Sequence, residues 1–97
     1  MAKYIALLNW TDQGIRAAKQ TVERAEAARR AFEGLGVKMT DIWWTMGQYD
    51  VVCVLEADND ETITRAGLAL GMQGNVRSTT LRAFDEGEMA SILKGLP

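Results

Sequence analysis

Histidine is absent from this chain of 97 residues, and cysteine and proline each occur once. The absence of histidine excludes Ser-His-Asp and Cys-His catalysis, the usual zinc sites and an imidazole-ligated haem. The single cysteine, Cys53, excludes an internal disulfide, and its place in the apolar run 51–55 predicts a small buried side chain rather than a reactive thiol. We therefore expect no metal and no cofactor.

The chain also lacks a long apolar run and an excess of basic residues. No run approaches the roughly 18 residues of a membrane-spanning helix, and the N-terminal residues do not form a secretory signal. A net charge of −2 does not provide the concentrated basic field that nucleic acid binding requires. We expect a cytoplasmic protein without membrane or nucleic acid partners.

What is present is typical of a folded domain. Hydrophobic residues make up 47% of the chain and charged residues 25%, with no linker or low-complexity run. The length allows one domain, residues 1–97.

Two periodicities predict the secondary structure. Alternating or continuous apolar residues predict strands at 3–9, 37–45, 50–57 and 76–84, with 50–57 central and 76–84 at an edge of the sheet. Apolar residues three and four apart predict a long helix at 13–35, a second at 61–70 and a short one at 85–96. The short helix is expected to carry Met89, Ile92 and Leu93 inward.

Helix ends and turns have their own signals. Thr11 or Asp12 can cap the first helix, and Asp58 and Glu61 have the spacing of a capping box before the second. Gly67 is expected to let the second helix approach the sheet closely. The acidic segment 58–61 lacks the ligand order of a calcium loop, so we expect no metal there.

The order strand-helix-strand-strand-helix-strand matches the ferredoxin-like pattern, an α+β fold with a four-stranded antiparallel sheet. Both main helices are then expected on one face of the sheet, because such crossovers are right-handed. The other face is expected to carry apolar side chains, which would be unfavourable in water for a monomer. Trp43 and Trp44 are adjacent on a strand, so their side chains are expected to point to opposite faces. The residues predicted for the open face are Tyr4, Ala6, Leu8, Trp43, Val52 and Val54. We therefore predict a homodimer or a higher homo-oligomer, with Tyr4, Leu8, Val52 and Val54 in the interface.

A set of polar and aromatic side chains is the candidate ligand site: Asn9, Trp10, Trp43, Tyr49, Asp50, Arg77 and Arg82. Tyr49 and Asp50 offer a phenol and a carboxylate that can share or relay a proton if one is reoriented at the Gly47 turn, where positive φ is expected. The alternative is structural: Tyr49 packs at a subunit seam, and Asp50 caps the turn or pairs with Arg77 or Arg82.

Two further interpretations stay open. The segment 71–77 can form an anion cradle of backbone N–H groups with Arg77, or can serve only as a turn. The tryptophans can line an aromatic pocket, or can anchor the core and the interface.

Gly47, Tyr49 and Asp50 resemble the signature of the GYD-domain family of small bacterial proteins. The resemblance extends through segments 9–14, 74–77 and 81–84, so it covers nearly the whole chain. It implies a ferredoxin-like fold of the dimeric α/β-barrel type, but it carries no established reaction onto these residues.

Two functions compete at this point. The first is a non-enzymatic homo-oligomeric module for assembly or for binding a small molecule. The second is a cofactor-independent isomerase or monooxygenase, with a pocket enclosed by the sheet and a partner subunit and with Tyr49, Asp50 or Arg82 as acid, base or anion-stabilising group. Only fold analogy supports the second function.

Overall fold

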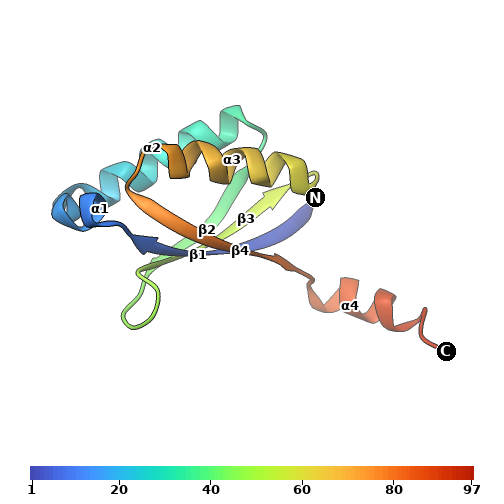
Figure 1. The fold of residues 1–97 in the computed structure, drawn as a ribbon. Helices are drawn as coiled ribbons and strands as arrows, with labels where there is room; N and C mark the ends of the chain where they lie inside the picture. Colours follow the sequence, from blue (N-terminus) through green and yellow to red (C-terminus); the bar gives the residue numbers. More distant parts are fainter.

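Four antiparallel strands form one sheet in the order β2-β3-β1-β4 (Figure 1). Their bounds in the computed structural model, which describes residues 1–97, are β1 Ala2–Trp10, β2 Lys38–Trp44, β3 Val51–Ala57 and β4 Val76–Ala83. β3 is central and β4 lies at an edge, as predicted. The helices α2 (Thr21–Gly34) and α3 (Asp60–Met72) cover one face, so the α+β architecture is confirmed and is consistent with a ferredoxin-like fold.

The predicted helix over 13–35 is interrupted. It consists of α1 (Asp12–Arg16), a short 3-10 turn (Ala18–Gln20) and α2. The hydroxyl of Thr11 accepts a hydrogen bond from the Gly14 N–H and caps α1, as one of the two predicted caps. The Arg24 guanidinium donates to the carbonyls of Gly14 and Ala17, at 3.2 and 2.6 Å. These carbonyls lie where α1 ends, so Arg24 satisfies acceptors that the break leaves unpaired.

The capping box predicted at Asp58 and Glu61 does not form, and the helix begins with a simple N-cap one residue later. Asn59 caps α3, because its side chain accepts hydrogen bonds from the backbone and hydroxyl of Thr62, both at 2.9 Å. Asn serves this position as well as Asp does, since either offers an oxygen to the free N–H groups of the first turn.

The core lies between the helices and one face of the sheet. Tyr4, Ala6 and Leu8 belong to it, with exposed fractions of 2%, 5% and 6%. The prediction that these three side chains lie on the opposite, open face of the sheet is wrong. The register explains the difference: Tyr4 pairs with Leu55 and Leu8 pairs with Val51, whose side chains the helices bury.

The open face instead carries Ile5 and Leu7 from β1. Lys3 pairs with Glu56 on this same side, because residues two apart on a strand share a face. Burial of this side beneath the helices would also bury two charged groups, which costs free energy unless they are fully paired. The predicted placement of Val52 and Val54 on the open face agrees with the register, which pairs them with Leu7 and Ile5.

The last helix, α4 (Glu86–Leu93), extends away from the rest of the molecule (Figure 1). Met89, Ile92 and Leu93 are 43%, 47% and 53% exposed, so their predicted inward orientation is wrong. The helix has a capping box between Asp85 and Glu88, which satisfies its first turn without contact with the core. No helix of the chain combines the length and the apolar character that crossing a membrane requires.

Two helical glycines provide a paired test of the packing. A Cβ added at Gly14 would lie 2.0 Å from the Asn75 carbonyl oxygen, whereas a Cβ at Gly67 meets nothing within 4 Å. The close approach predicted for Gly67 therefore occurs at Gly14. We expect Gly67→Ala to raise the free energy of unfolding by about 0.5 to 1 kcal/mol, because alanine is the better helix former.

Gly14→Ala should instead lower the free energy of unfolding by about 1 to 3 kcal/mol, as overpacking of a close contact does. Urea denaturation of both variants measures the contrast. Equal effects of the two substitutions would show that α1 does not pack on the 74–75 loop as described.

Candidate functional site

Four of the predicted site residues meet where β1 ends beside the β2–β3 hairpin. The Asp50 carboxylate accepts a hydrogen bond from the Trp10 backbone N–H at 2.9 Å, and the Asp50 N–H donates to the Leu8 carbonyl at 2.9 Å. The Asn9 amide donates to the Gln48 carbonyl at 2.7 Å. Gly47 has φ +102°, which confirms the predicted positive φ at the turn. These bonds attach the hairpin to the end of β1.

The chemistry predicted for Tyr49 and Asp50 does not match these contacts. No arginine lies within ion-pair distance of Asp50, so the predicted pairing with Arg77 or Arg82 is wrong. The Tyr49 carbonyl accepts from the Thr45 hydroxyl at 2.5 Å, but the Tyr49 phenol makes no hydrogen bond within the chain. The structure thus favours the structural interpretation of Asp50, as an anchor for the turn.

The other three predicted residues are spread over the sheet. Arg77 pairs with Asn9 in the β1–β4 register and is exposed near the hairpin end. Trp43 is 52% exposed on the open face, whereas Trp44 lies on the helix side and donates its indole N–H to the Thr21 hydroxyl at 2.9 Å. Arg82 pairs with Tyr4 at the far end, five residues along β4 and roughly 17 Å from Arg77 by strand rise. One site cannot contain all seven residues.

Arg82 belongs to a second polar cluster at the opposite end of the sheet. Its guanidinium lies 4.4 Å from the Phe84 ring centre, 5.6 Å from that of Tyr4, and 3.6 Å from the Glu88 carboxylate. The Tyr4 hydroxyl donates to Asp60 at 2.5 Å, and this hydrogen bond, with burial, raises the pKa of Tyr4 above its ordinary value.

Lys3 connects the sheet to α4 in the same cluster. Its ammonium donates a hydrogen bond to the Asp85 carboxylate at 3.1 Å, which raises the pKa of Lys3. The Glu88 backbone N–H donates to Asp85, and this bond with the Lys3 contact holds the pKa of Asp85 below its ordinary value. The cluster orients α4 where the chain leaves the sheet.

The loop before β4 is occupied by contacts within the chain. Gly74 has φ +84°, and its carbonyl accepts from the Thr11 hydroxyl at 2.5 Å. The Asn75 carbonyl accepts from the Thr11 N–H, and its side chain accepts from Gln13. These bonds favour the interpretation of 71–77 as a turn that receives α1, not as an anion cradle.

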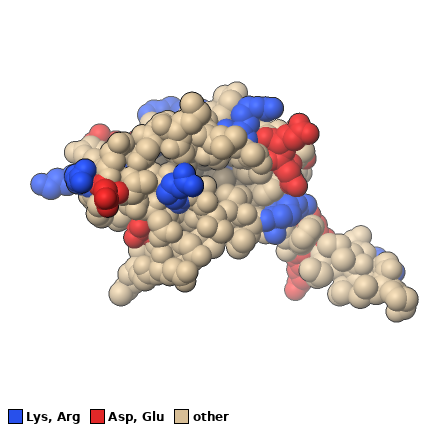
Figure 2. Space-filling view, viewed as in Figure 1, with Lys and Arg blue, Asp and Glu red and all other residues tan.

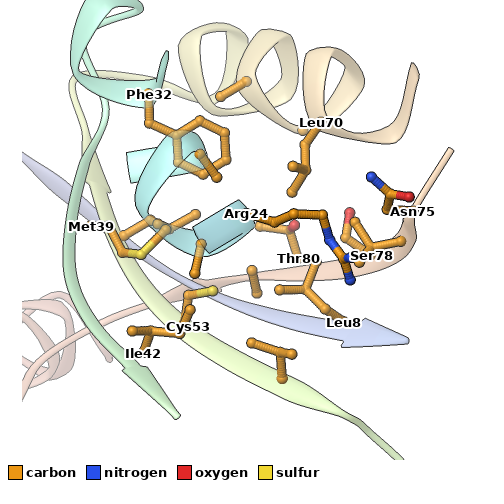
Figure 3. A pocket seen from close by; sticks show the side chains of 18 of the residues that line it. Leu8, Arg24, Phe32, Met39, Ile42, Cys53, Leu70, Asn75, Ser78 and Thr80 are labelled. Carbon is orange, nitrogen blue, oxygen red and sulfur yellow. The ribbon is translucent and has the colours of Figure 1, made fainter. Parts of the chain in front are cut away.

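A pocket lies between the helices and the sheet (Figure 3). Its walls are mainly apolar, with Leu8, Phe32, Met39, Ile42 and Leu70 among them. Cys53 also lines it, and burial raises the pKa of this thiol to about 11, so the thiol is neutral at physiological pH. Cys53 is buried, as predicted.

Arg24 is the one charged residue in the pocket lining, and the sequence interpretation did not include it. A signal was available, because Arg24 lies next to Ala25 and four residues before Ala28, on the side of the helix that faces the sheet. A basic residue within an apolar stripe is unusual enough to single out. Ile5, Leu7 and Leu81 were missed for a different reason, since their exposure depends on which face the helices cover.

Comparison with known proteins identifies the family of the chain. Residues 4–93 match the model of the GYD domain. The chain belongs to the GYD-domain family. A curated relative from Thermus thermophilus is 32% identical over 95 residues, which cover 97% of this chain and 100% of the relative. It is described as a glutamine synthetase and cystathionine beta-lyase binding protein.

A solved structure shares the fold of this GYD-domain protein. The crystal structure of a Thermus thermophilus chain superimposes with a TM-score of 0.56 at 21% identity, and the match covers 88% of this chain and 95% of that one. At that identity, the similarity shows the fold alone.

Asp50 is expected to act through its hydrogen bond to Trp10. Asp50→Ala should lower the free energy of unfolding by about 1 kcal/mol, because it leaves the Trp10 N–H without its acceptor. Asp50→Asn should cost less, since an amide oxygen can still accept. Urea denaturation compares both with Asp58→Ala, a control at an exposed carboxylate that forms no ion pair. An equal loss for the two Asp50 variants would show that the charge, not the acceptor, is what matters.

Asp85 gives α4 a predicted dependence on pH. Its pKa lies below the ordinary 3.8, so its contribution is fully present above about pH 4 and is lost as the pH falls through the lowered pKa. We expect the Glu88 amide resonance to report loss of the cap by NMR as the pH falls below 3.8 and through the lowered pKa of Asp85. Asp85→Asn should keep the cap over this range, since asparagine does not titrate and also caps helices. A transition of the same size in that variant would assign the change to another group.

Proposed function

We propose that this GYD-domain protein is a non-enzymatic binding module that assembles with copies of itself and docks on other enzymes. The open sheet face is the observation that carries the proposal. It presents apolar side chains from all four strands: Trp43 from β2, Val52 and Val54 from β3, Ile5 and Leu7 from β1, and Leu81 from β4. Trp43 and Leu81 are 52% and 46% exposed.

The arrangement of this face resembles an interface more than an ordinary surface. The apolar residues of β1 and β3 form its centre, while Asp41 on β2 and Thr79 on β4 lie toward its margins. An apolar centre with a polar rim is the usual composition of protein interfaces. Exposed aromatic residues such as Trp43 are frequent anchors in them.

The sheet face alone is small for a stable dimer. Four strands of about seven residues cover a flat area of roughly 450 Å² by strand spacing and rise. A standard interface buries about 800 Å² on each partner. The projecting helix α4 supplies further apolar surface, because Met89, Ile92 and Leu93 are exposed and the middle of the arm is uncharged in the view of Figure 2. We propose that the sheet face pairs copies of the chain and that α4 extends the contact.

The Thermus relative supports the second part of the proposal. Its description as a binding protein for two enzymes, together with the match along almost the whole chain, suggests that enzymes are also partners of this protein. Glutamine synthetase is the first one to test. Docking would require no catalytic group of the module itself, only a rigid and partly apolar surface.

Self-association is tested with Trp43→Glu. The wild type should sediment as a dimer or a larger assembly at micromolar concentration, and Trp43→Glu should shift the mass toward the monomer by placing a charge in the apolar surface. Val22→Glu is the control, because Val22 is 61% exposed on α2, on the other side of the sheet. A monomeric wild type with a native circular dichroism spectrum would contradict the assembly proposal.

Enzyme docking is tested by surface plasmon resonance with immobilised glutamine synthetase from the same organism. The wild type should bind, and a chain that ends at Phe84 and so lacks α4 shows whether the arm takes part. The signal from a reference channel with immobilised bovine serum albumin is subtracted to correct for non-specific binding. No binding to glutamine synthetase at micromolar concentration would reject this enzyme as a partner without affecting the assembly measurement.

A further inference from the structure

We infer that the pocket between the helices and the sheet is a binding site for a small carboxylate with a short apolar body, whose negative charge pairs with Arg24. This site is separate from the open face and from α4. It therefore goes beyond the proposed function and does not depend on it. Three features carry the inference: the lining, the state of the guanidinium and the size of the space.

The lining combines an apolar body with one cation. Sixteen of the 23 residues around the pocket are hydrophobic, and Arg24 is the only charged one. The remaining polar groups include the hydroxyls of Ser78 and Thr80 on β4 and the amide of Asn75 (Figure 3). Mostly apolar walls with a few converging polar groups are the usual composition of small-molecule sites.

The Arg24 guanidinium has donors to spare. An arginine carries five N–H groups, and hydrogen bonds to the Gly14 and Ala17 carbonyls use two of them. No carboxylate of the chain forms an ion pair with Arg24, although the side chain is only partly exposed. In Figure 3 the guanidinium end points toward the part of the pocket that Ser78 and Leu8 line.

This state of Arg24 determines the charge of the ligand. A partly buried cation without a counter-ion is costly, and an incoming anion relieves that cost. A carboxylate also fits the planar fork of a guanidinium, which can hold two oxygens at once. The two backbone carbonyls hold the guanidinium in place, so little side-chain entropy is lost on binding.

The space limits the size of the ligand. The pocket has a volume of about 80 Å³. A cavity of about 150 Å³ holds benzene, so this space takes an apolar body of roughly three or four carbons. A carboxylate with a chain of that length fits the pocket. The hollow beneath the helices in Figure 2 gives an opening from solvent.

The test uses two probes of equal size. Pentanoate and pentanamide have the same number of heavy atoms, but only pentanoate carries a charge. In ligand-observed NMR with the full-length protein, we expect pentanoate to bind roughly tenfold or more tightly than pentanamide, the ratio that one charge-assisted hydrogen bond supports. In protein-observed NMR spectra, the backbone amide shifts of Leu8, Cys53 and Ser78 should change on binding, and that of Trp43 should not. Equal affinities, or shifts confined to the open face, would overturn the inference.

Three variants separate the contribution of the Arg24 charge to binding from that of the pocket volume. Arg24→Met should bring pentanoate down to the affinity of pentanamide, and Arg30→Met on the same helix should change neither, since Arg30 is exposed and makes no hydrogen bond or ion pair. Ala28→Leu fills the pocket and should abolish binding of both probes while Arg24 remains.

Arg24→Met also removes the two bonds that hold α1, so it can fail to fold. In that case the wild-type contrast between the two probes and the Ala28→Leu result decide the question. Retention of pentanoate binding by a folded Ala28→Leu variant would place the binding elsewhere and reject the site. Failure of these probes leaves the sedimentation and docking experiments unaffected.

Discussion

The pairing of β1 with its neighbours is the constraint on which the rest of the structure depends. In the register found, Tyr4 lies opposite Leu55 and Leu8 opposite Val51, and the pair Lys3 and Glu56 falls on the other side of the sheet. A slip of one residue would exchange the two faces of β1 and place Lys3 beneath the helices. The helical layer, the core and the identity of the open face all follow from this register.

The helical layer is held to the sheet by contacts near α1 as well as by the core. Gly14 packs against Asn75, and Thr11 bonds to the same loop, so the start of the helical layer is attached to the loop before β4. Arg24 then connects α2 to the end of α1 through two backbone carbonyls. The same side chain lines the pocket, which makes the geometry of the pocket depend on how the helix is broken.

The surfaces of the molecule divide by chemistry. The helix side holds an apolar pocket with one cation, the open side holds an uncharged apolar centre, and the end near Arg82 holds a network of ion pairs that orients α4. The close spacing of Gly47 and Asp50 has a structural explanation in this arrangement. The glycine makes the turn, and the aspartate attaches the turn to the N–H of Trp10. Gly47 and Asp50 thus explain how the hairpin is built. Membership of the GYD-domain family does not by itself assign a reaction to the protein.

The sequence by itself determined the order of the elements, the four-stranded antiparallel sheet, the burial of Cys53, the positive φ at Gly47 and the opposite orientations of Trp43 and Trp44. These features depend on local periodicity and on single-residue conformational preferences, which are readable without knowing distant contacts. Only the tertiary structure decided which face of β1 is buried, because both of its alternating sets are apolar. It also decided that the first helix breaks after α1, that Asp50 bonds to Trp10 instead of an arginine, and that α4 leaves the core. Each of these depends on groups far apart in the sequence, such as Gly14 with Asn75 and Lys3 with Asp85, whose contact no local pattern encodes.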